Sequence, residues 1–400
     1  MNILVINSGS SSIKFRLFEM PGSVILFEGI IEKIGYKNSF ITTRKNNQKE
    51  IQHDIAISDH QKGIDYLLNI ITGKNYGCLK KLDELGAVGH RVAHGGDEFS
   101  KSILLGEKII EKIEKYNELA PLHNPHNLKG IRAIQKHLPD IKQVAVFDTS
   151  FHQSIPEYVY LYALPYDLYK KYKIRRYGFH GPSHYYVSKR ACEILQVDIE
   201  QQKIITCHLG NGSSMAAIDK GKSIDTSMGF TPLEGLIMGT RTGDMDIGIV
   251  PYLIEKEKLN ADTLAEQLYN KSGLLGITGI SPDIREIEDA SNSDSMAQLG
   301  LNMFYYRVKK YIGAYTAVLN GLDILVFTGG IGENSYKTRE GICKGLDFLG
   351  IDLNKNKNQN ERLQEKTISK KDSRVTVIVV PTNEEQIIAE ETFNIITDSP

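Results

Sequence analysis

The chain has 400 residues, of which 41% are hydrophobic, and a formal net charge of −1 at pH 7. This length exceeds what one hydrophobic core usually serves, so the sequence predicts two domains. The balanced charge argues against a nucleic-acid partner, and we find neither a signal-like amino terminus nor an apolar run that could span a bilayer. We therefore expect a cytoplasmic protein that acts on small molecules.

Cysteine usage agrees with a reducing compartment. The four cysteines stand apart without the spacing of a zinc site, at Cys78, Cys192, Cys207 and Cys343. We expect free thiols, and a hard cation held by carboxylates and phosphate oxygens as the more plausible metal.

Two stretches of the chain share one pattern: a strand, a polar glycine turn and a returning strand. The first runs through the turn Asn7-Ser-Gly-Ser-Ser-Ser12, and the second through Gly210-Asn-Gly-Ser-Ser214. Such turns present backbone N–H groups that suit the phosphates of a nucleotide. The recurrence predicts a structural duplication, with one turn in each half of the chain.

A third glycine element follows the apolar run Ile324 to Phe327, at Thr328-Gly-Gly-Ile-Gly-Glu-Asn334. It predicts a strand, a bend and a helix start, but it matches neither the Rossmann fingerprint nor the P-loop. Helix-like periodicity marks residues 63–71, 107–119, 127–137, 182–195 and 295–319. The polar region from Asn354 to Arg374 is predicted to be a solvated surface excursion without a function.

The segment from Asp225 to Gly248 is dense in glycine, threonine and aspartate and contains one arginine, Arg241. Glycine-rich backbone beside a lone guanidinium is typical of an anion site, although an exposed arginine on a surface loop gives the same pattern. Histidines and arginines also stand beside glycines in His90-Arg-Val-Ala-His-Gly-Gly96 and Arg176-Tyr-Gly-Phe-His-Gly181. A single histidine is more often packed than catalytic, but their recurrence at strand ends indicates a site.

Taken in order, these motifs resemble the acetate kinase family from end to end. The resemblance rests on the segments 7–14, 90–96, 147–152 and 176–181, on the segment that contains Arg241, and on Thr382-Asn-Glu-Glu385. It implies an α/β protein of the sugar kinase, Hsp70 and actin superfamily, with two ribonuclease-H-like domains and an interdomain nucleotide cleft. It also implies a homodimer and reversible transfer of phosphate between ATP and acetate, which gives acetyl phosphate and ADP.

The resemblance also implies roles for individual residues, each matched in this chain. It assigns catalysis to Arg91, Asp148, His180 and Arg241, and magnesium (or manganese) binding to Asn7 and Glu384. It places the substrate against Arg91 and an apolar cup of Ala93, Leu122, Phe179 and Pro232. The residues implied for ATP and ADP are Lys14, His208, Leu209, Gly210, Asn211, Gly212, Asp283, Ile284, Arg285, Gly330, Ile331, Gly332, Glu333 and Asn334. We expect one domain at 1–152, completed by a helix at 386–400, and a nucleotide-binding domain at 153–385.

The chemistry of phosphoryl transfer suits such residues. A phosphoryl group in flight spreads negative charge over its oxygens, so the site needs cations and N–H donors around it. The carboxylate of the substrate is already ionised at pH 7 and needs no general base. We therefore expect Asp148 to position magnesium and not to act as a base. We expect direct in-line transfer, with a glutamyl phosphate on Glu384 as the competing route.

Two other functions stay open. A non-catalytic nucleotide switch of the actin or Hsp70 type would share the fold but would not need Arg91, Arg241 and an apolar cup. A sugar kinase would need a base for its neutral hydroxyl substrate. Within the carboxylate kinases, Ala93 replaces the valine usual in the family and predicts room for propionate beside acetate.

Overall fold

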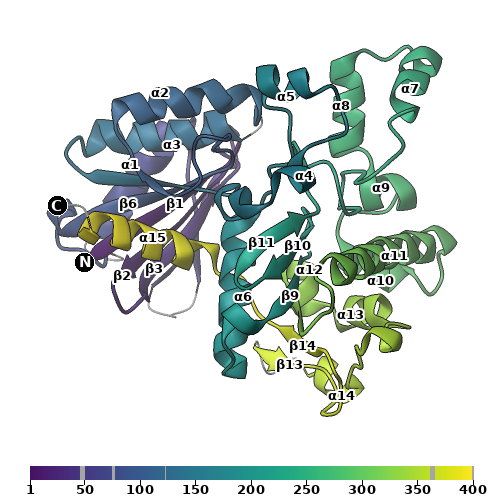
Figure 1. The fold of residues 1–400 in the computed structure, drawn as a ribbon. Helices are drawn as coiled ribbons and strands as arrows, with labels where there is room; N and C mark the ends of the chain where they lie inside the picture. Colours follow the sequence, from purple (N-terminus) through teal and green to yellow (C-terminus); the bar gives the residue numbers. More distant parts are fainter. Residues whose placement is uncertain (46–49, 74–76, 122, 361–364, 399–400) are drawn as a thin grey trace. The chain divides into compact units, whose positions relative to one another are not determined.

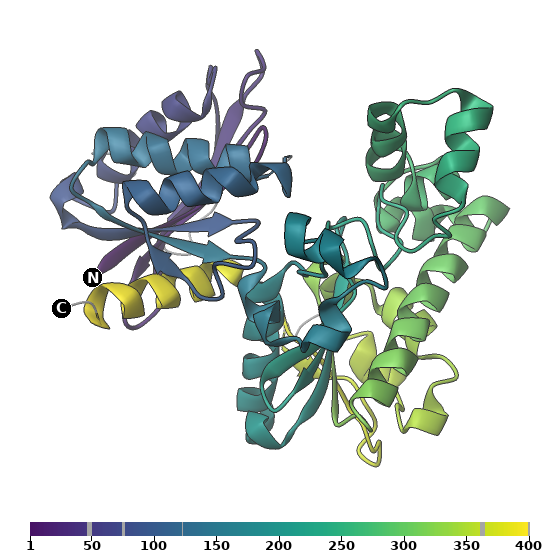
Figure 2. The ribbon, with the colours of Figure 1, turned by 45° about the horizontal axis from the view of Figure 1, so that its top comes forward.

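The computed structural model describes residues 1–45, 50–73, 77–121, 123–360 and 365–398. The chain divides into two compact units, one of Met1–Ser150 with Asn383–Pro400 and one of Phe151–Thr382 (Figure 1). Figure 2 shows the same ribbon after a rotation of 45°. Each unit contains one sheet with helices on both faces.

The first unit is built on an eight-stranded sheet of order β5-β4-β3-β2-β1-β6-β8-β7. Strands β1, β6 and β8 are parallel neighbours, and the other pairs are antiparallel. The strands are β1 (Asn2–Ser8), β2 (Ile13–Glu19), β3 (Val24–Glu32), β4 (Phe40–Lys45), β5 (Ile51–Asp54), β6 (Leu85–Val92), β7 (Ile103–Leu104) and β8 (Lys142–Phe147). The helices are α1 (His60–Thr72), α2 (Glu107–Lys115), α3 (Asn124–His137) and α15 (Glu384–Asp398).

Strand β1 shows why helices cover both faces of this sheet. Its side chains alternate between faces, and both sets are apolar. Leu4 and Ile6 pack into a core with α1 and α3, whereas Ile3 and Val5 pack against α15. The last helix of the chain therefore belongs to the core of the first unit.

The second unit has a six-stranded sheet of order β11-β10-β9-β12-β14-β13. Its strands are β9 (Lys203–His208), β10 (Ser214–Asp219), β11 (Lys222–Thr226), β12 (Ile324–Thr328), β13 (Lys366–Thr367) and β14 (Thr376–Val379). Helix α6 (Gly181–Leu195) packs on one face, and α11 (Ser295–Val318) packs on the other with α9 (Gly273–Thr278), α10 (Ile284–Ala290) and α13 (Tyr336–Cys343). The remaining helices are α4 (Glu157–Tyr160), α5 (Tyr166–Tyr172), α7 (Ile249–Glu257), α8 (Ala261–Asn270), α12 (Gly329–Asn334) and α14 (Lys355–Asn358).

The two sheets share one topology. In each, three successive strands form an antiparallel meander, and two later strands add in parallel beside the first strand of that meander. The order β3-β2-β1-β6-β8 in the first unit thus recurs as β11-β10-β9-β12-β14 in the second. The predicted duplication is confirmed, and each polar glycine turn joins the first two strands of its sheet.

One prediction about the second unit is wrong. The region from Asn354 to Arg374 is more than a solvated excursion, because β13 pairs with β14 and the side chains of Asn358 and Ile368 are buried. The predicted helices are present with shifted ends, and the four cysteines are free thiols. None of the helices in the described ranges has the length and apolarity needed to cross a bilayer.

Candidate active site

In the first unit, three predicted residues meet at one edge of the sheet. Asn7 lies near the end of β1, Arg91 near the end of β6, and Asp148 directly follows β8. Because these strands are parallel neighbours, their carboxyl ends bring the three side chains together. The Arg91 guanidinium donates to both carboxylate oxygens of Asp148, from Nε at 2.9 Å and from Nη2 at 2.5 Å, and from Nη1 to Asn7 Oδ1 at 3.3 Å.

Nearby carboxylates hold the Arg91 guanidinium in its charged form. Burial alone would lower the pKa of Arg91, but the carboxylates of Asp148 and Glu384 outweigh it and raise that pKa above its ordinary value. The fork between Arg91 and Asp148 fixes the guanidinium plane, since a bidentate pair holds both partners in one orientation. Arg91 is thus a permanent, oriented cation.

The start of α15 adds two carboxylates to the same cluster. Glu385 forms ion pairs with Lys14 at 2.5 Å and Arg16 at 3.5 Å, so both of its oxygens are engaged. Glu384 is different: burial, together with the charges of Asp148 and Glu385, raises its pKa to about 7 despite the opposing effect of Arg91. A further cation would stabilise the ionised form of Glu384, which burial and the neighbouring carboxylates disfavour.

These residues fit a magnesium ion of the kind that kinases use. No group of three or more His, Cys, Asp or Glu side chains in the described ranges forms a metal cage. Magnesium bound beside a nucleotide takes few protein oxygens and completes its shell with water and phosphate. Glu384 and the oxygen of Asn7 suit that requirement, whereas Glu385 is taken by Lys14 and Arg16.

Two residues of the predicted apolar cup fall in the first unit. Ala93 follows β6 and is buried, and its backbone N–H donates to Asn127 Oδ1 at 3.0 Å. Asn127 also donates to the carbonyl of Ser8 at 2.7 Å, so one amide of α3 ties the ends of β1 and β6 together. Leu122 lies outside the described residues.

In the second unit, Arg241, His180 and Gly212 converge. A Cβ added to Gly212 would lie 3.6 Å from Arg241 Nη1, 3.6 Å from His180 Cε1 and 3.7 Å from His180 Nε2. Arg241 donates to the carbonyl of Pro232 at 3.3 Å and lies 6.0 Å from the ring of Tyr269. No ion pair neutralises Arg241 within the described part of the chain, and burial lowers its pKa. A half-buried cation beside a bare glycine and an imidazole suits an anion.

His180 is held in an unusual conformation at the start of α6. Its φ is +57°, in the left-handed region, and its ring stacks on His208 with centroids 4.3 Å apart. His180 Nδ1 lies 3.0 Å from Ser214 Oγ, which in turn lies 2.7 Å from His184 Nε2. These contacts engage Nδ1, and Nε2 lies on the side of Gly212 and Arg241.

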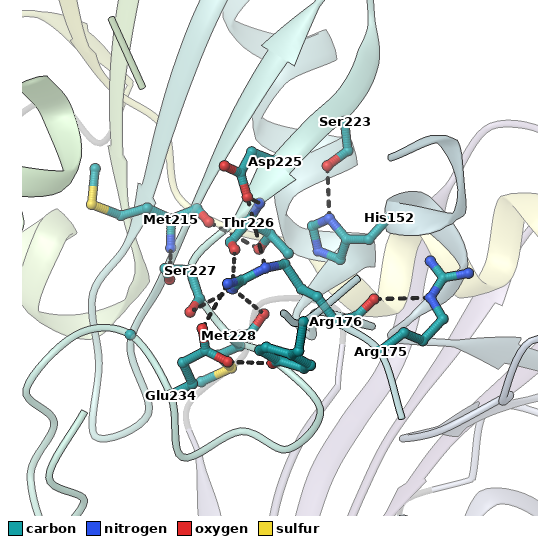
Figure 3. Close-up of polar contacts among 12 residues, drawn as sticks. His152, Arg175, Arg176, Met215, Ser223, Asp225, Thr226, Ser227, Met228 and Glu234 are labelled. Atoms are coloured by element: carbon teal, nitrogen blue, oxygen red, sulfur yellow. Dashed lines mark hydrogen bonds and ion pairs between the residues drawn. The ribbon is translucent and has the colours of Figure 1, made fainter. Parts of the chain in front are cut away.

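His152 fixes the backbone before His180, and Figure 3 shows the contact of its ring with Ser223. His152 Nδ1 lies 2.8 Å from Ser223 Oγ, and Nε2 donates to the carbonyl of Phe179 at 3.1 Å. Burial lowers the pKa of His152 to about 4, so the ring is neutral at pH 7. His152 is therefore a packed histidine that positions its neighbours in the fold.

The loop that carries Arg241 is braced by a second arginine. Figure 3 shows Arg176 donating to the carbonyl of Thr226 at 2.8 Å and to Glu234 Oε1 at 2.6 Å. Burial alone would lower the pKa of Arg176, but the Glu234 charge outweighs it and raises that pKa. Tyr162 also donates to Glu234. The loop before Arg241 is thus tied to β11 by charged hydrogen bonds, which are among the stronger ones in proteins.

A cavity of 580 Å³ opens beside the β9–β10 turn, within the size range of small-molecule sites. It is lined by Gly210, Asn211, Pro282, Asp283, Ile284, Arg285, Glu288, Gly330, Ile331, Asn334 and Ser335. Eight of the fourteen residues predicted for the nucleotide line this cavity: Gly210, Asn211, Asp283, Ile284, Arg285, Gly330, Ile331 and Asn334.

Other residues predicted for the nucleotide do not line this cavity. Glu333 accepts from the N–H groups of Gly329 at 2.9 Å and Thr382 at 3.0 Å, so its carboxylate closes a backbone turn. Gly332 offers its carbonyl to Arg339 at 2.7 Å. Sequence reasoning missed Pro282, Glu288 and Ser335. The signal for the burial of Glu288 was its position in α10, four residues after Ile284 and next to Ile287, on the apolar face of the helix.

The rest of the predicted apolar cup lies in the second unit. Phe179 packs with Met228 and Met238 in a small buried cluster. Pro232 is partly buried, and its carbonyl accepts from Arg241. The apolar side chains and the anion site therefore share one loop region of this unit.

Comparison with known proteins places this arrangement in a family. The model of the acetokinase family matches residues 2–390. The chain belongs to the acetokinase family. An acetate kinase of Bacteroides thetaiotaomicron is 53% identical over 399 residues, which cover 99% of this chain and 100% of that one.

Two solved structures of the family carry the same fold. The crystal structure of Porphyromonas gingivalis acetate kinase is 50% identical, with a TM-score of 0.93 and 99% of each chain covered. A propionate kinase from Francisella tularensis is 43% identical, with a TM-score of 0.92 and 98% of this chain and 99% of that chain covered. The predicted family, fold class and phosphotransferase function are confirmed.

Proposed function

We propose that this protein catalyses magnesium-dependent transfer of a phosphoryl group between ATP and acetate. The observation that carries the proposal is the convergence of Arg241, His180 and Gly212, where a guanidinium that has no carboxylate partner among the described residues faces a bare backbone. Family membership supports the substrates, because relatives that match the whole chain are named acetate kinases.

The chain's own residues divide the work. The unit of residues 151–382 is proposed to bind the nucleotide, with Arg241, His180 Nε2 and backbone N–H groups donating to the phosphoryl oxygens as their charge grows. Arg91, oriented by Asp148, is proposed to hold the substrate carboxylate. A carboxylate needs no base to become a nucleophile, so these residues bind, orient and exclude water.

Asn7 and Glu384 are proposed to hold magnesium, which supplies charge neutralisation on the phosphate oxygens when bound. Asp148 is proposed to position that ion through the cluster that it shares with Glu384. We propose a direct transfer, because two oriented arginines already provide the proximity that a phosphoenzyme would otherwise supply. The family resemblance also supports a homodimer in the cytoplasm, which light scattering and cell fractionation can test.

The proposal is tested by trapping the product. Protein, ATP, magnesium, acetate and hydroxylamine should yield acetohydroxamate, which gives a coloured ferric complex. Turnover of ATP without hydroxamate would refute acetate as the acceptor and favour a nucleotide switch. A second candidate, propionate, is favoured by the small side chain of Ala93 and by the related propionate kinase, and it is measured in the same assay.

A further inference from the structure

One buried carboxylate at the cavity has no part in the proposed chemistry. Glu288 lies on α10, lines the cavity and is only 8% exposed. Its Oε1 accepts from the hydroxyl of Thr338 at 2.8 Å and from the hydroxyl of Ser335. A buried carboxylate is costly unless it is paired, so this one is a built feature of the pocket.

The second oxygen of Glu288 faces open space. Within the described residues no hydrogen bond or ion pair reaches Oε2. This oxygen is not fully buried, so another molecule can reach it. The open space beside Glu288 is the cavity. Oε2 is therefore an available acceptor at that wall.

The donors around Glu288 are already used. The Ser335 hydroxyl donates to Glu288 and accepts from the N–H of Thr338 at 3.0 Å. The Asn334 amide donates to the carbonyl of Gly330 at 2.9 Å. Arg339 donates to two backbone carbonyls and to Asn358, although its charge is close enough to interact with Glu288. Glu288 thus offers a hydrogen-bond acceptor to the cavity, and this favours a ligand that carries a hydrogen-bond donor.

The remaining walls set the direction of a bound nucleotide. Gly210 and Asn211 belong to the glycine turn between β9 and β10, where backbone N–H groups suit phosphates. Ile284 and Ile331 supply apolar surface to the same cavity. With its phosphates at the turn, a nucleotide would place its base among the other lining residues, which include Glu288.

We propose that Glu288 reads the base of the nucleotide and selects a purine with an amino group at carbon 6. This deepens the proposed function and rests on it, because it takes the cavity to be the nucleotide site. The amino group of adenine donates to Oε2. Hypoxanthine carries a carbonyl at the same position, which places two acceptors against each other and leaves a buried carboxylate oxygen unpaired.

The test compares ATP with ITP, which differ at that position. Wild-type protein should use ATP with a kcat/KM about 10-fold to 100-fold above that for ITP, and the difference should lie mainly in KM. Glu288→Gln should bring the ratio near one, because an amide can accept from the amino group or donate to the carbonyl. Glu286→Gln is the matched control, since Glu286 lies on the same helix and is exposed.

Calorimetry with ADP and IDP measures nucleotide binding without a carboxylate substrate. It therefore tests base recognition by Glu288 independently of the proposed phosphoryl transfer. Preferential binding of ADP that Glu288→Gln abolishes supports base reading even if no acyl phosphate forms. Equal binding of ADP and IDP by the wild-type protein overturns the proposal without any variant. A nucleotide ratio that Glu288→Gln leaves at the wild-type value in a folded protein overturns it as well.

Discussion

Replacing Gly212 by alanine tests whether the space between Arg241 and His180 receives the phosphoryl group. The added Cβ would have no neighbour closer than 3.6 Å, and Gly212 has no positive φ that an alanine would resist. The fold should therefore accept the methyl group at little cost. The methyl would nevertheless stand at van der Waals distance from Arg241 Nη1 and from His180 Nε2.

The size of the effect follows from that geometry. A phosphoryl oxygen must come within about 2.7–3.2 Å of each nitrogen to accept its hydrogen bond. A methyl carbon at 3.6 and 3.7 Å from the two nitrogens occupies the approach from the Gly212 side. Loss of one preorganised donor lowers kcat by about 10²-fold to 10³-fold, so we expect a fall of about 10²-fold for Gly212→Ala.

The assay is steady-state formation of acetohydroxamate, with thermal unfolding measured in parallel. Gly313→Ala is the control, because Gly313 lies within α11 and an added Cβ there meets no atom within 4 Å. The control should keep full activity and gain about 0.5–1 kcal/mol of stability from the loss of a helical glycine. Full activity in a stable Gly212→Ala protein would refute the assignment of this space to the phosphoryl group.

Three further changes test other parts of the account. Arg241→Leu should lower kcat by about 10²-fold with little change in ADP affinity by calorimetry, and a loss confined to the KM for ATP would contradict its role. Ala93→Val should raise the KM for propionate more than that for acetate, whereas an unchanged ratio of kcat/KM would show that no extra space exists. Burial lowers the pKa of His90 and of His152 to about 4, below the value of about 6.5 expected on unfolding. The unfolded chain thus gains protons first as the pH falls from 6.5 to 4, so Tm should drop across that window, and His90→Gln should flatten the drop.

The sequence predicted much of the fold because its strands are strongly patterned. The turns at Asn7 to Ser12 and at Gly210 to Ser214 follow buried runs, and both join antiparallel strands in the structure. The charged residues Arg91 and Asp148 were recognisable at strand ends, where parallel strands gather side chains at one edge.

The features that the sequence did not predict depend on contacts between distant segments. Nothing local distinguishes Asn358 from other polar residues of its region, yet it accepts from Arg339 at 2.8 Å and is buried. Glu333 stands in a glycine-rich motif, but its carboxylate bonds to the backbone of Thr382, 49 residues away. Glu288 gains its surroundings from α13, which periodicity within α10 cannot reveal.

The central claim is that the phosphoryl group of ATP passes to the carboxylate of acetate. Phosphorus NMR of the protein with ATP, magnesium and acetate follows both products at once, and the account predicts that acetyl phosphate and ADP appear in equal amounts, with both greatly slowed by Arg241→Leu. Release of ADP with inorganic phosphate and without acetyl phosphate would contradict it.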